Sequence, residues 1–218
     1  KKILIAAVFA MFSSANVNAF EMPSLDGFSL GVSGTGWQFD GAKGSETTSS
    51  ETREEDLAAI LGSVFVEYNL GPVSIGVDFI PYTLATETSE NNQMSPALTD
   101  SGRTLIQADI KEHVTGYVVV PVVDTGFFVR AAMMSANFVT NETMATGSQY
   151  GNADLEGWAV SVGYQIDTDA GVSIRAEAGQ AEYDDINITG TGGDGTANTV
   201  TATGLDGPTA KLSIVKSF

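Results

Sequence analysis

Hydrophobic and polar residues alternate along most of the chain after residue 20, with the period of two that is typical of β-strands. The segment Val73–Phe79 shows the pattern: valine, isoleucine and phenylalanine occupy its odd-numbered positions, and serine, glycine and aspartate occupy its even-numbered ones. No segment has a convincing helical stripe. We therefore predict eight strands: Phe28–Phe39, Leu57–Tyr68, Val73–Leu84, Leu105–Val120, Phe127–Phe138, Leu155–Ile166, Val172–Tyr183 and Leu205–Phe218.

The connections between these strands are short and long in strict alternation. Three are short turns that contain glycine with proline, aspartate or asparagine, the residues that tight turns favour: Asn69–Pro72, Pro121–Gly126 and Asp167–Gly171. Four are long polar stretches: Asp40–Asp56, Ala85–Thr104, Val139–Asp154 and Asp184–Gly204. This arrangement is typical of outer-membrane barrels, which have short periplasmic turns and long outer loops. The predicted fold class is all-β: an eight-stranded, antiparallel, up-and-down transmembrane β-barrel.

The two faces of the predicted strands indicate which side meets lipid. The apolar faces are continuous, whereas the opposite faces carry small or charged residues, as Val172–Gly179 shows. An eight-stranded barrel encloses only enough space for side chains, so small and charged residues suit its interior and the apolar set suits lipid.

Nine polar side chains are predicted to line this interior: Glu67, Asp78, Asp109, Lys111, His113, Arg130, Arg175, Glu177 and Lys211. Five of them lie within about six residues of the nearest short turn and should cluster at the periplasmic end: Glu67, Asp78, Arg130, Arg175 and Glu177. Two arginines among three carboxylates allow the ion pairs that buried charges require. We favour a polar plug that fills the narrow barrel over a gate or a proton relay.

Aromatic residues at lipid-facing positions predict a belt at each membrane surface. Four lie beside the short turns or the chain end and two lie toward the long loops: Tyr68, Phe127, Tyr164 and Phe218, then Phe79 and Trp158. Glu112 and Lys216 share the lipid-facing parity. For Glu112 we expect either a place near the outer interface or a bulge that turns it inward. Lys216 lies close enough to the periplasmic edge to reach water.

Residues 1–19 have the layout of a secretory signal peptide: two lysines, an apolar run and small residues up to Ala19. A buried N-terminal helix is the alternative. The predicted division is a signal peptide over residues 1–19 and an outer-membrane barrel over residues 20–218. No later segment has the twenty or so consecutive apolar residues of a transmembrane helix, so a closed barrel is the other way to cross lipid.

The formal charge of −17 at pH 7 argues against nucleic acid as a partner, because phosphates would be repelled. The absence of cysteine excludes a thiolate metal site and a cysteine nucleophile. The first long loop contains five acidic residues that could bind divalent cations or bridge lipopolysaccharide through them: Glu46, Glu51, Glu54, Glu55 and Asp56. A simple solvated loop is the more economical interpretation, and the glycine-rich segment Gly190–Gly195 is read as flexible loop. We predict no metal site and no cofactor.

The last eight residues, Lys211–Phe218, alternate and end in phenylalanine. This segment resembles the C-terminal strand of bacterial outer-membrane proteins, which implies recognition by the barrel assembly machinery; Lys216 departs from the usual apolar residue at its position. With the N-terminal segment and four long loops, the chain resembles the small eight-stranded family typified by the OmpA membrane domain, OmpX and opacity-type surface proteins. The resemblance implies contact with outer-membrane lipid and lipopolysaccharide, and a structural, adhesive or receptor role for the loops.

Two other membrane functions and a soluble fold are the alternatives to this interpretation. A narrow pore for small solutes or ions is the first alternative. A lipid-modifying enzyme is the second, but the only histidine, His113, has no obvious serine near it, so we predict no catalytic residue. A soluble periplasmic barrel is the third, and it would place the apolar faces inside.

Overall fold

The structure is a computed structural model that describes residues 26–46, 52–86, 88–92, 103–143, 149–168, 171–191 and 197–218. The predicted signal peptide and Glu51 lie outside the described residues. Among the described residues there is no helix long and apolar enough to cross a membrane.

In these described residues, thirteen strands form one antiparallel sheet. Their bounds are β1 Phe28–Glu46, β2 Thr52–Asn69, β3 Ser74–Phe79, β4 Leu84–Ala85, β5 Ser89–Asn92, β6 Arg103–Pro121, β7 Phe127–Thr143, β8 Gln149–Tyr150, β9 Ala153–Asp167, β10 Val172–Tyr183, β11 Ile186–Thr191, β12 Ala197–Thr203 and β13 Asp206–Ser217. Eight strands form a ring in the order β1, β2, β3, β6, β7, β9, β10 and β13. β13 pairs with β1 from Ser29↔Ser217 to Trp37↔Thr209, which closes the ring. The predicted eight-stranded antiparallel barrel is therefore confirmed.

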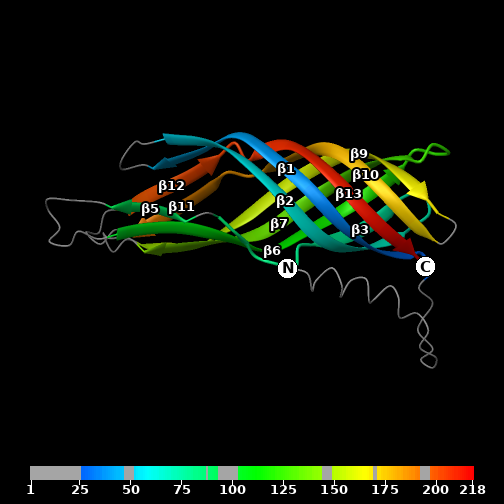
Figure 1. Cartoon of the computed structure of the whole chain (residues 1–218), viewed down its shortest axis with the longest axis horizontal. Helices are drawn as coiled ribbons and strands as arrows, with labels where there is room; N and C mark the ends of the chain where they lie inside the picture. Colours follow the sequence, from blue (N-terminus) through cyan, green and yellow to red (C-terminus); the bar gives the residue numbers. More distant parts are fainter. Residues whose placement is uncertain are drawn as a thin grey trace, which may run out of the picture.

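The two ends of the barrel differ, as Figure 1 shows. At one end, here called the short-turn end, adjacent strands are joined by the three predicted tight turns. Gly71 and Gly171 adopt positive φ angles of 96° and 66° in two of them, a conformation that L-residues with side chains rarely tolerate. At the opposite end, here called the hairpin end, β1, β2, β6 and β7 run on past their predicted limits, and β5, β8, β11 and β12 add short strands.

The long polar stretches are consequently less loop-like than predicted. The stretch Asp40–Asp56 contains the ends of β1 and β2, and Asp184–Gly204 contains the hairpin of β11 and β12. Gly190 and Thr191 lie in β11, so the glycine-rich segment begins inside a strand and then passes outside the described residues. Polar composition does not prevent strand formation here, because backbone pairing continues along neighbouring strands beyond the lipid.

Candidate functional site

The outer surface of the ring carries a band of apolar side chains, here called the lipid band. Each of the eight strands contributes to it an outward-facing, exposed residue: Leu30, Val66, Val77, Val118, Val129, Val162, Ile174 and Ile214. Toward the hairpin end the outward positions become polar and remain exposed: Gln38, Asp56, Glu112, Ser135, Glu156, Glu182 and Asp206. An apolar band about 25 Å tall is what a membrane requires of a barrel surface.

All six aromatic residues predicted to form belts are exposed on this surface: Tyr68, Phe79, Phe127, Trp158, Tyr164 and Phe218. Their rings meet across strands at the short-turn end, where the Phe127 and Tyr164 centroids are 4.9 Å apart. Phe28, which we had not assigned to a belt, packs on Tyr68 with centroids 4.7 Å apart. Aromatic rings at this level are typical of the boundary between hydrocarbon and headgroups.

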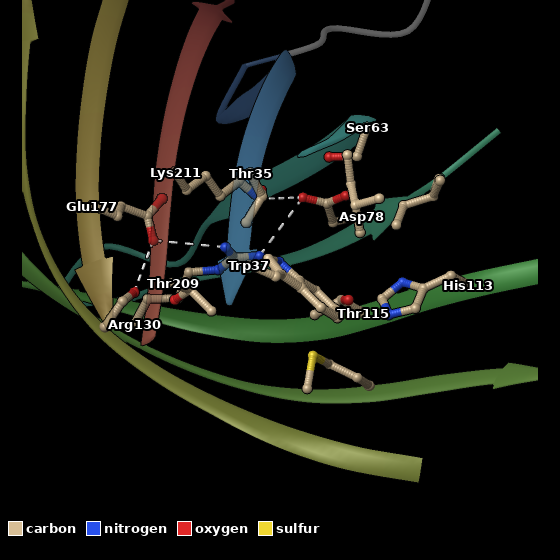
Figure 2. A pocket seen from close by; sticks show the side chains of 14 residues that line it. Thr35, Trp37, Ser63, Asp78, His113, Thr115, Arg130, Glu177, Thr209 and Lys211 are labelled. Atoms are coloured by element: carbon tan, nitrogen blue, oxygen red, sulfur yellow. Dashed lines mark hydrogen bonds and ion pairs between the residues drawn. The ribbon is translucent and has the colours of Figure 1, made fainter. Parts of the chain in front are cut away.

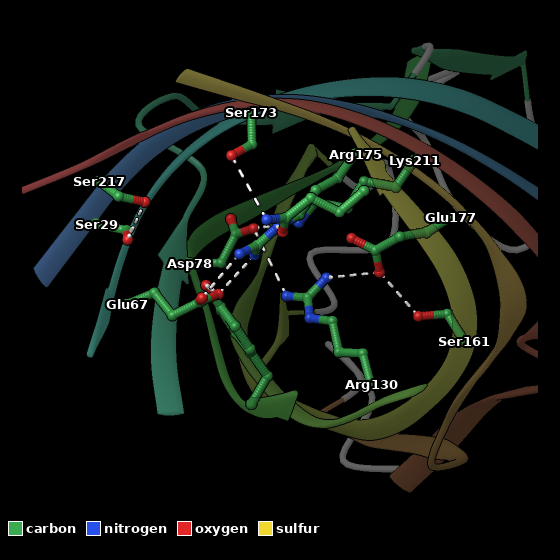
Figure 3. Close-up of polar contacts among 12 residues, drawn as sticks. Ser29, Glu67, Asp78, Arg130, Ser161, Ser173, Arg175, Glu177, Lys211 and Ser217 are labelled. Atoms are coloured by element: carbon green, nitrogen blue, oxygen red, sulfur yellow. Dashed lines mark hydrogen bonds and ion pairs between the residues drawn. The ribbon is translucent and has the colours of Figure 1, made fainter. Parts of the chain in front are cut away.

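The interior enclosed by the lipid band is polar, and its centre is a network of ion pairs (Figure 3). Arg175 on β10 donates two hydrogen bonds to Glu67 on β2, at 2.7 Å and 2.9 Å. Its Nε donates to Gln165 on β9 at 2.6 Å, and Tyr117 on β6 donates to Glu67 at 3.3 Å. The paired guanidinium and carboxylate are the geometry in which a buried ion pair best offsets its desolvation cost.

A second group of charges lies beside this pair. Lys211 on β13 donates to Asp78 on β3, and Arg130 on β7 lies 3.8 Å from Asp78 and 3.6 Å from Glu177 on β10. Glu177 also accepts a hydrogen bond of 2.8 Å from Ser161. The Arg130 guanidinium lies 3.9 Å from the centre of the Tyr117 ring, which packs it against the interior wall.

The network, here called the charge plug, therefore contains three carboxylates and three cations and has no net charge: Glu67, Asp78, Glu177, Arg130, Arg175 and Lys211. Five of the eight ring strands contribute to it. Among the described residues, the only buried side-chain polar atom without a hydrogen-bond partner is Arg130 Nε. The plug accordingly ties opposite walls of the barrel together and fills the space between them.

A cavity of about 60 Å³ lies directly above the charge plug, toward the hairpin end. Figure 2 shows its lining, with Arg130 and Glu177 on one side and His113 on the other. His113 is buried, and its Nε2 is 2.6 Å from the hydroxyl of Tyr183. The Trp37 ring lies 5.6 Å from His113 and 5.4 Å from Tyr183, centre to centre. This volume suits a few ordered waters rather than a large solute.

Above the aromatic residues the interior becomes apolar. Eight buried side chains form one cluster there: Phe39, Met134, Ala136, Leu155, Ala181, Tyr183, Ile186 and Ile188. At this level the outward-facing positions are polar, as at Gln38, Ser135 and Glu156. The part of the barrel beyond the lipid band, here called the hairpin half, thus has the polarity of a water-soluble barrel. The part within the lipid band, here called the membrane half, has the reverse polarity.

Solved structures with the same architecture include OprG from Pseudomonas aeruginosa, an outer-membrane protein. It matches with a TM-score of 0.54 and 8% identity over 88% of this chain and 97% of that one. This chain has the fold of an outer-membrane β-barrel. The Escherichia coli outer-membrane protease OmpT matches at 9% identity over 91% of this chain and 99% of that one, with a TM-score of 0.49. Neisserial surface protein A matches at 10% identity over 88% and 98%, with a TM-score of 0.41. The sequence matches no protein-family model and no curated protein.

Two residues predicted for the barrel interior lie outside it. β6 has a bulge between Lys111 and Val114, and Glu112 adopts a positive φ of 54° there. The bulge reverses the parity of the residues beyond it, so Ile110 packs against the interior cluster. Asp109 and Lys111 instead pair with each other, 3.1 Å apart, on the outer wall of the barrel.

The bulge also determines the position of Glu112, for which the sequence allows two. Its side chain remains exposed and accepts a hydrogen bond of 2.7 Å from Asn137. It therefore lies at the outer boundary of the lipid band rather than inside the barrel. Nearby, hydrogen bonds from Lys111 and Asn141 hold the pKa of Asp109 below its usual value.

The interior residues that we had not predicted include four aromatic ones: Tyr117, Tyr183, Trp37 and Phe39. Tyr117 shares the parity of His113 and Thr115, so alternation alone would have placed it inside. Of the five acidic residues considered as cation ligands in the first long stretch, Glu54 lies 3.7 Å from Lys43 and Asp56 accepts a hydrogen bond from the Gly41 amide. No group of three or more histidines, aspartates or glutamates is placed to hold a metal ion among the described residues of the barrel.

Proposed function

We propose that this chain is a closed surface barrel, anchored by its membrane half, whose hairpin half projects outside the cell and serves an adhesive or receptor role. The observation that carries the proposal is the charge plug, which fills the membrane half with neutralised, mutually bonded side chains. A channel needs a continuous polar path, and the cavity above the plug measures only about 60 Å³. A binding role instead needs an exposed, rigid platform.

The hairpin half supports such a role because its interior is packed. The apolar cluster around Phe39, Leu155 and Tyr183 holds the extended strands together above the lipid band. Loops placed on a rigid scaffold are favourable positions for recognition residues. The stretches 40–56, 85–112, 139–156 and 182–206 contain 19 of the 27 acidic residues and four of the ten basic ones. This charge favours basic partners and repels polyanions.

The same proposal includes three contacts with the cell envelope. Outer-membrane lipid and lipopolysaccharide surround the lipid band and its outer boundary. The C-terminal strand β13 is the segment that the barrel assembly machinery recognises. Divalent cations bridge exposed carboxylates such as Asp56 to lipopolysaccharide phosphates, since both are hard oxygen ligands.

The first test of the proposal is conductance. The full chain, refolded into planar bilayers, is expected to give no unitary current steps, whereas substituting Arg130 and Glu177 together with alanine should open a path and give small steps. Steady unitary conductance from the unmodified barrel would contradict the proposal and favour the narrow pore.

The second test is adhesion. Cells that display the chain should adhere to surfaces coated with lysozyme, a basic protein, more than to surfaces coated with albumin. Neutralising four exposed acids of the hairpin half as Glu54→Gln, Asp154→Asn, Asp184→Asn and Asp185→Asn should reduce this adhesion several-fold. Asp124→Asn, in a short turn, is the control and should leave it unchanged. Equal adhesion to lysozyme by cells that display the unmodified chain, the four-fold variant and Asp124→Asn would reject the binding role.

A further inference from the structure

The wall of the barrel is split on one side at the hairpin end. The ladder between β2 and β3 runs from Asn69↔Ser74 to Val64↔Phe79 and stops there. β4 and β5, which follow β3 in the chain, pair with β6 instead. Within the described part of the chain, β2 from residue 52 to residue 63 is therefore paired with β1 alone. We call this unpaired side of β2 the open edge.

The direction of the backbone groups along the open edge is fixed by one hydrogen bond. The Gly62 amide donates across the split to the Tyr82 hydroxyl at 2.6 Å. In an antiparallel strand, alternate residues direct both N–H and C=O to the same side. Ile60, Ala58 and the residues at alternate positions above them therefore present their backbone groups to the split. Tyr82 marks the lower end of the open edge.

The open edge lies at the polar boundary of the lipid band and beyond it. Ala58 is directly opposite Gln38 of β1, one of the outward polar positions, and Ile60 and Asp56 on either side of Ala58 are exposed. An unpaired strand edge presents backbone N–H and C=O groups that a further strand can satisfy. Ile60 is also 87% exposed, more than any other large hydrophobic residue described. An occupant that supplies strand hydrogen bonds would satisfy this backbone and cover Ile60 at the same time.

Charge selects the kind of occupant. Glu54 and Asp56 are exposed on β2, and Glu90 is exposed on β5. The stretch 40–56 as a whole contains six acidic and two basic residues. An exposed edge is a template for any extended chain, but these carboxylates repel acidic segments and attract basic ones.

We propose that the open edge of β2, between Glu54 and Ile60, binds an extended basic segment of a partner protein by adding it to the sheet as a strand. The inference rests on the proposed surface role and names the partner for it. Main-chain hydrogen bonds supply the affinity in this mode, and side chains at alternate positions supply the selectivity. Lysine or arginine would meet Glu54 and Asp56, and an apolar residue would cover Ile60.

The experiment uses the full chain in lipid nanodiscs and a labelled ten-residue peptide in which lysine alternates with valine and threonine. The peptide should bind with a salt-dependent affinity, and the same peptide N-methylated at alternate amides should bind at least tenfold more weakly. Ala58→Pro removes an N–H that faces the split and leaves the ladder with β1 intact, so it should reduce affinity by a similar factor. Ala58→Thr, which keeps that N–H, is the matched control and should bind as the unmodified chain does.

A charge exchange tests the selectivity. Glu54→Lys should weaken binding of the lysine peptide and strengthen binding of a glutamate version, whereas Asp184→Lys at a different strand end should change neither. Equal binding of the N-methylated peptide, or an Ala58→Pro variant that is folded and binds normally, would overturn the proposal. So would a crosslinked dimer through position 60, because a second copy would then occupy the edge.

Failure of this inference is distinguishable from failure of the surface role. If the edge does not bind peptide but displaying cells still adhere to lysozyme, the proposed function stands and the edge is not its site. If the peptide binds in nanodiscs but cells do not adhere, the edge is real and the adhesive role is rejected.

Discussion

At the scale of single residues, the Glu67–Arg175 pair explains how charges persist inside a narrow barrel. The carboxylate accepts two hydrogen bonds from Arg175 and one from Tyr117, so its lone pairs are largely used. Arg175 additionally donates to Gln165. The low dielectric of the interior strengthens these bonds but also makes an unpartnered member costly.

Replacing one member of the pair is therefore expected to cost more than replacing both. Glu67→Leu leaves the Arg175 charge buried without a carboxylate and should lower the free energy of unfolding by about 3 kcal/mol. Combining it with Arg175→Met should recover more than half of that loss, because an apolar pair of similar volume needs no compensation. Urea unfolding in lipid vesicles measures both values. A double variant as unstable as the single one would show that the ion pair also stabilises neighbouring parts of the barrel.

Asp167 offers a pH-dependent test at the short-turn end, beyond the aromatic belt. Hydrogen bonds from Ser173, at 2.7 Å, and from Gln165, at 2.5 Å, hold the pKa of Asp167 below its usual value of 3.8. A carboxyl whose folded-state pKa is lowered stabilises the protein above its unfolded pKa, and this stabilisation is lost as pH falls through the folded pKa. The difference in urea midpoint between the unmodified chain and Asp167→Asn should be constant above about pH 5 and shrink below pH 4. A difference that grows with acid would refute this linkage.

The identity of the interior charges followed from alternation, but their partners did not. Arg175 and Glu67 are 108 positions apart in the chain, and nothing in either segment indicates that they meet. Asp109 and Lys111 show the limit of counting by twos, since one inserted residue at Glu112 reverses every position beyond it. A glutamate gives no sign of a positive φ, which glycine or asparagine would have indicated.

At the scale of strands, three aromatic rings are seated on glycines of neighbouring strands. Phe65 lies over Gly31, Tyr117 over Gly76 and Phe128 over Gly163, each directly opposite in register. A Cβ added to these glycines would lie 2.1–2.3 Å from the nearest ring atom. Glycine is thus the residue that lets a large ring lie flat in a narrow interior.

Gly76→Ala should consequently destabilise the barrel. The new Cβ would meet Tyr117, whose ring is held between Arg130 and the wall and whose hydroxyl donates to Glu67. Overpacking of this kind costs about 1–3 kcal/mol. Gly116→Ala is the control, because nothing lies within 4 Å of its Cβ position, and it should be neutral or slightly stabilising. Heat-modified gel mobility and urea midpoints report the two variants. Equal effects would mean that strand glycines matter for flexibility rather than for space.

The strands themselves were predictable where lipid imposes alternation, and their ends were not. Within the lipid band one face must be apolar, so the period of two is visible in segments such as Val73–Phe79. Beyond the lipid band the strand still alternates, but the polarity of its two faces is exchanged. On β1 the inward-facing residues change from Ser33 and Thr35 to Trp37 and Phe39, and Gln38 faces outward. If the outward face is assumed to be apolar along the whole strand, these ends resemble polar loops.

At the scale of the whole molecule, this exchange of polarity between the inner and outer faces divides the barrel into two parts made of the same strands. The membrane half buries charges and exposes hydrocarbon, and the hairpin half does the opposite. Each half satisfies the solvent around it, so the boundary where outward residues turn polar also fixes the height at which the barrel sits in the membrane. The position of the folded barrel in the bilayer is therefore determined both by the polarity of its outer surface and by the polarity of its interior.

Cysteine accessibility tests that position directly, because the native sequence contains no cysteine and single substitutions are unambiguous. Asp184→Cys, at the hairpin end, should react with a membrane-impermeant maleimide on intact cells. Val123→Cys lies in a short turn and is 79% exposed, so it should react only after the outer membrane is opened. Val77→Cys is nearly half exposed but faces the lipid band, so it should resist the water-soluble reagent in both conditions and react with a lipid-soluble one. Labelling of Val77→Cys by the water-soluble reagent would mean that this face meets water, and labelling of Val123→Cys on intact cells would mean that the barrel is inserted the other way up.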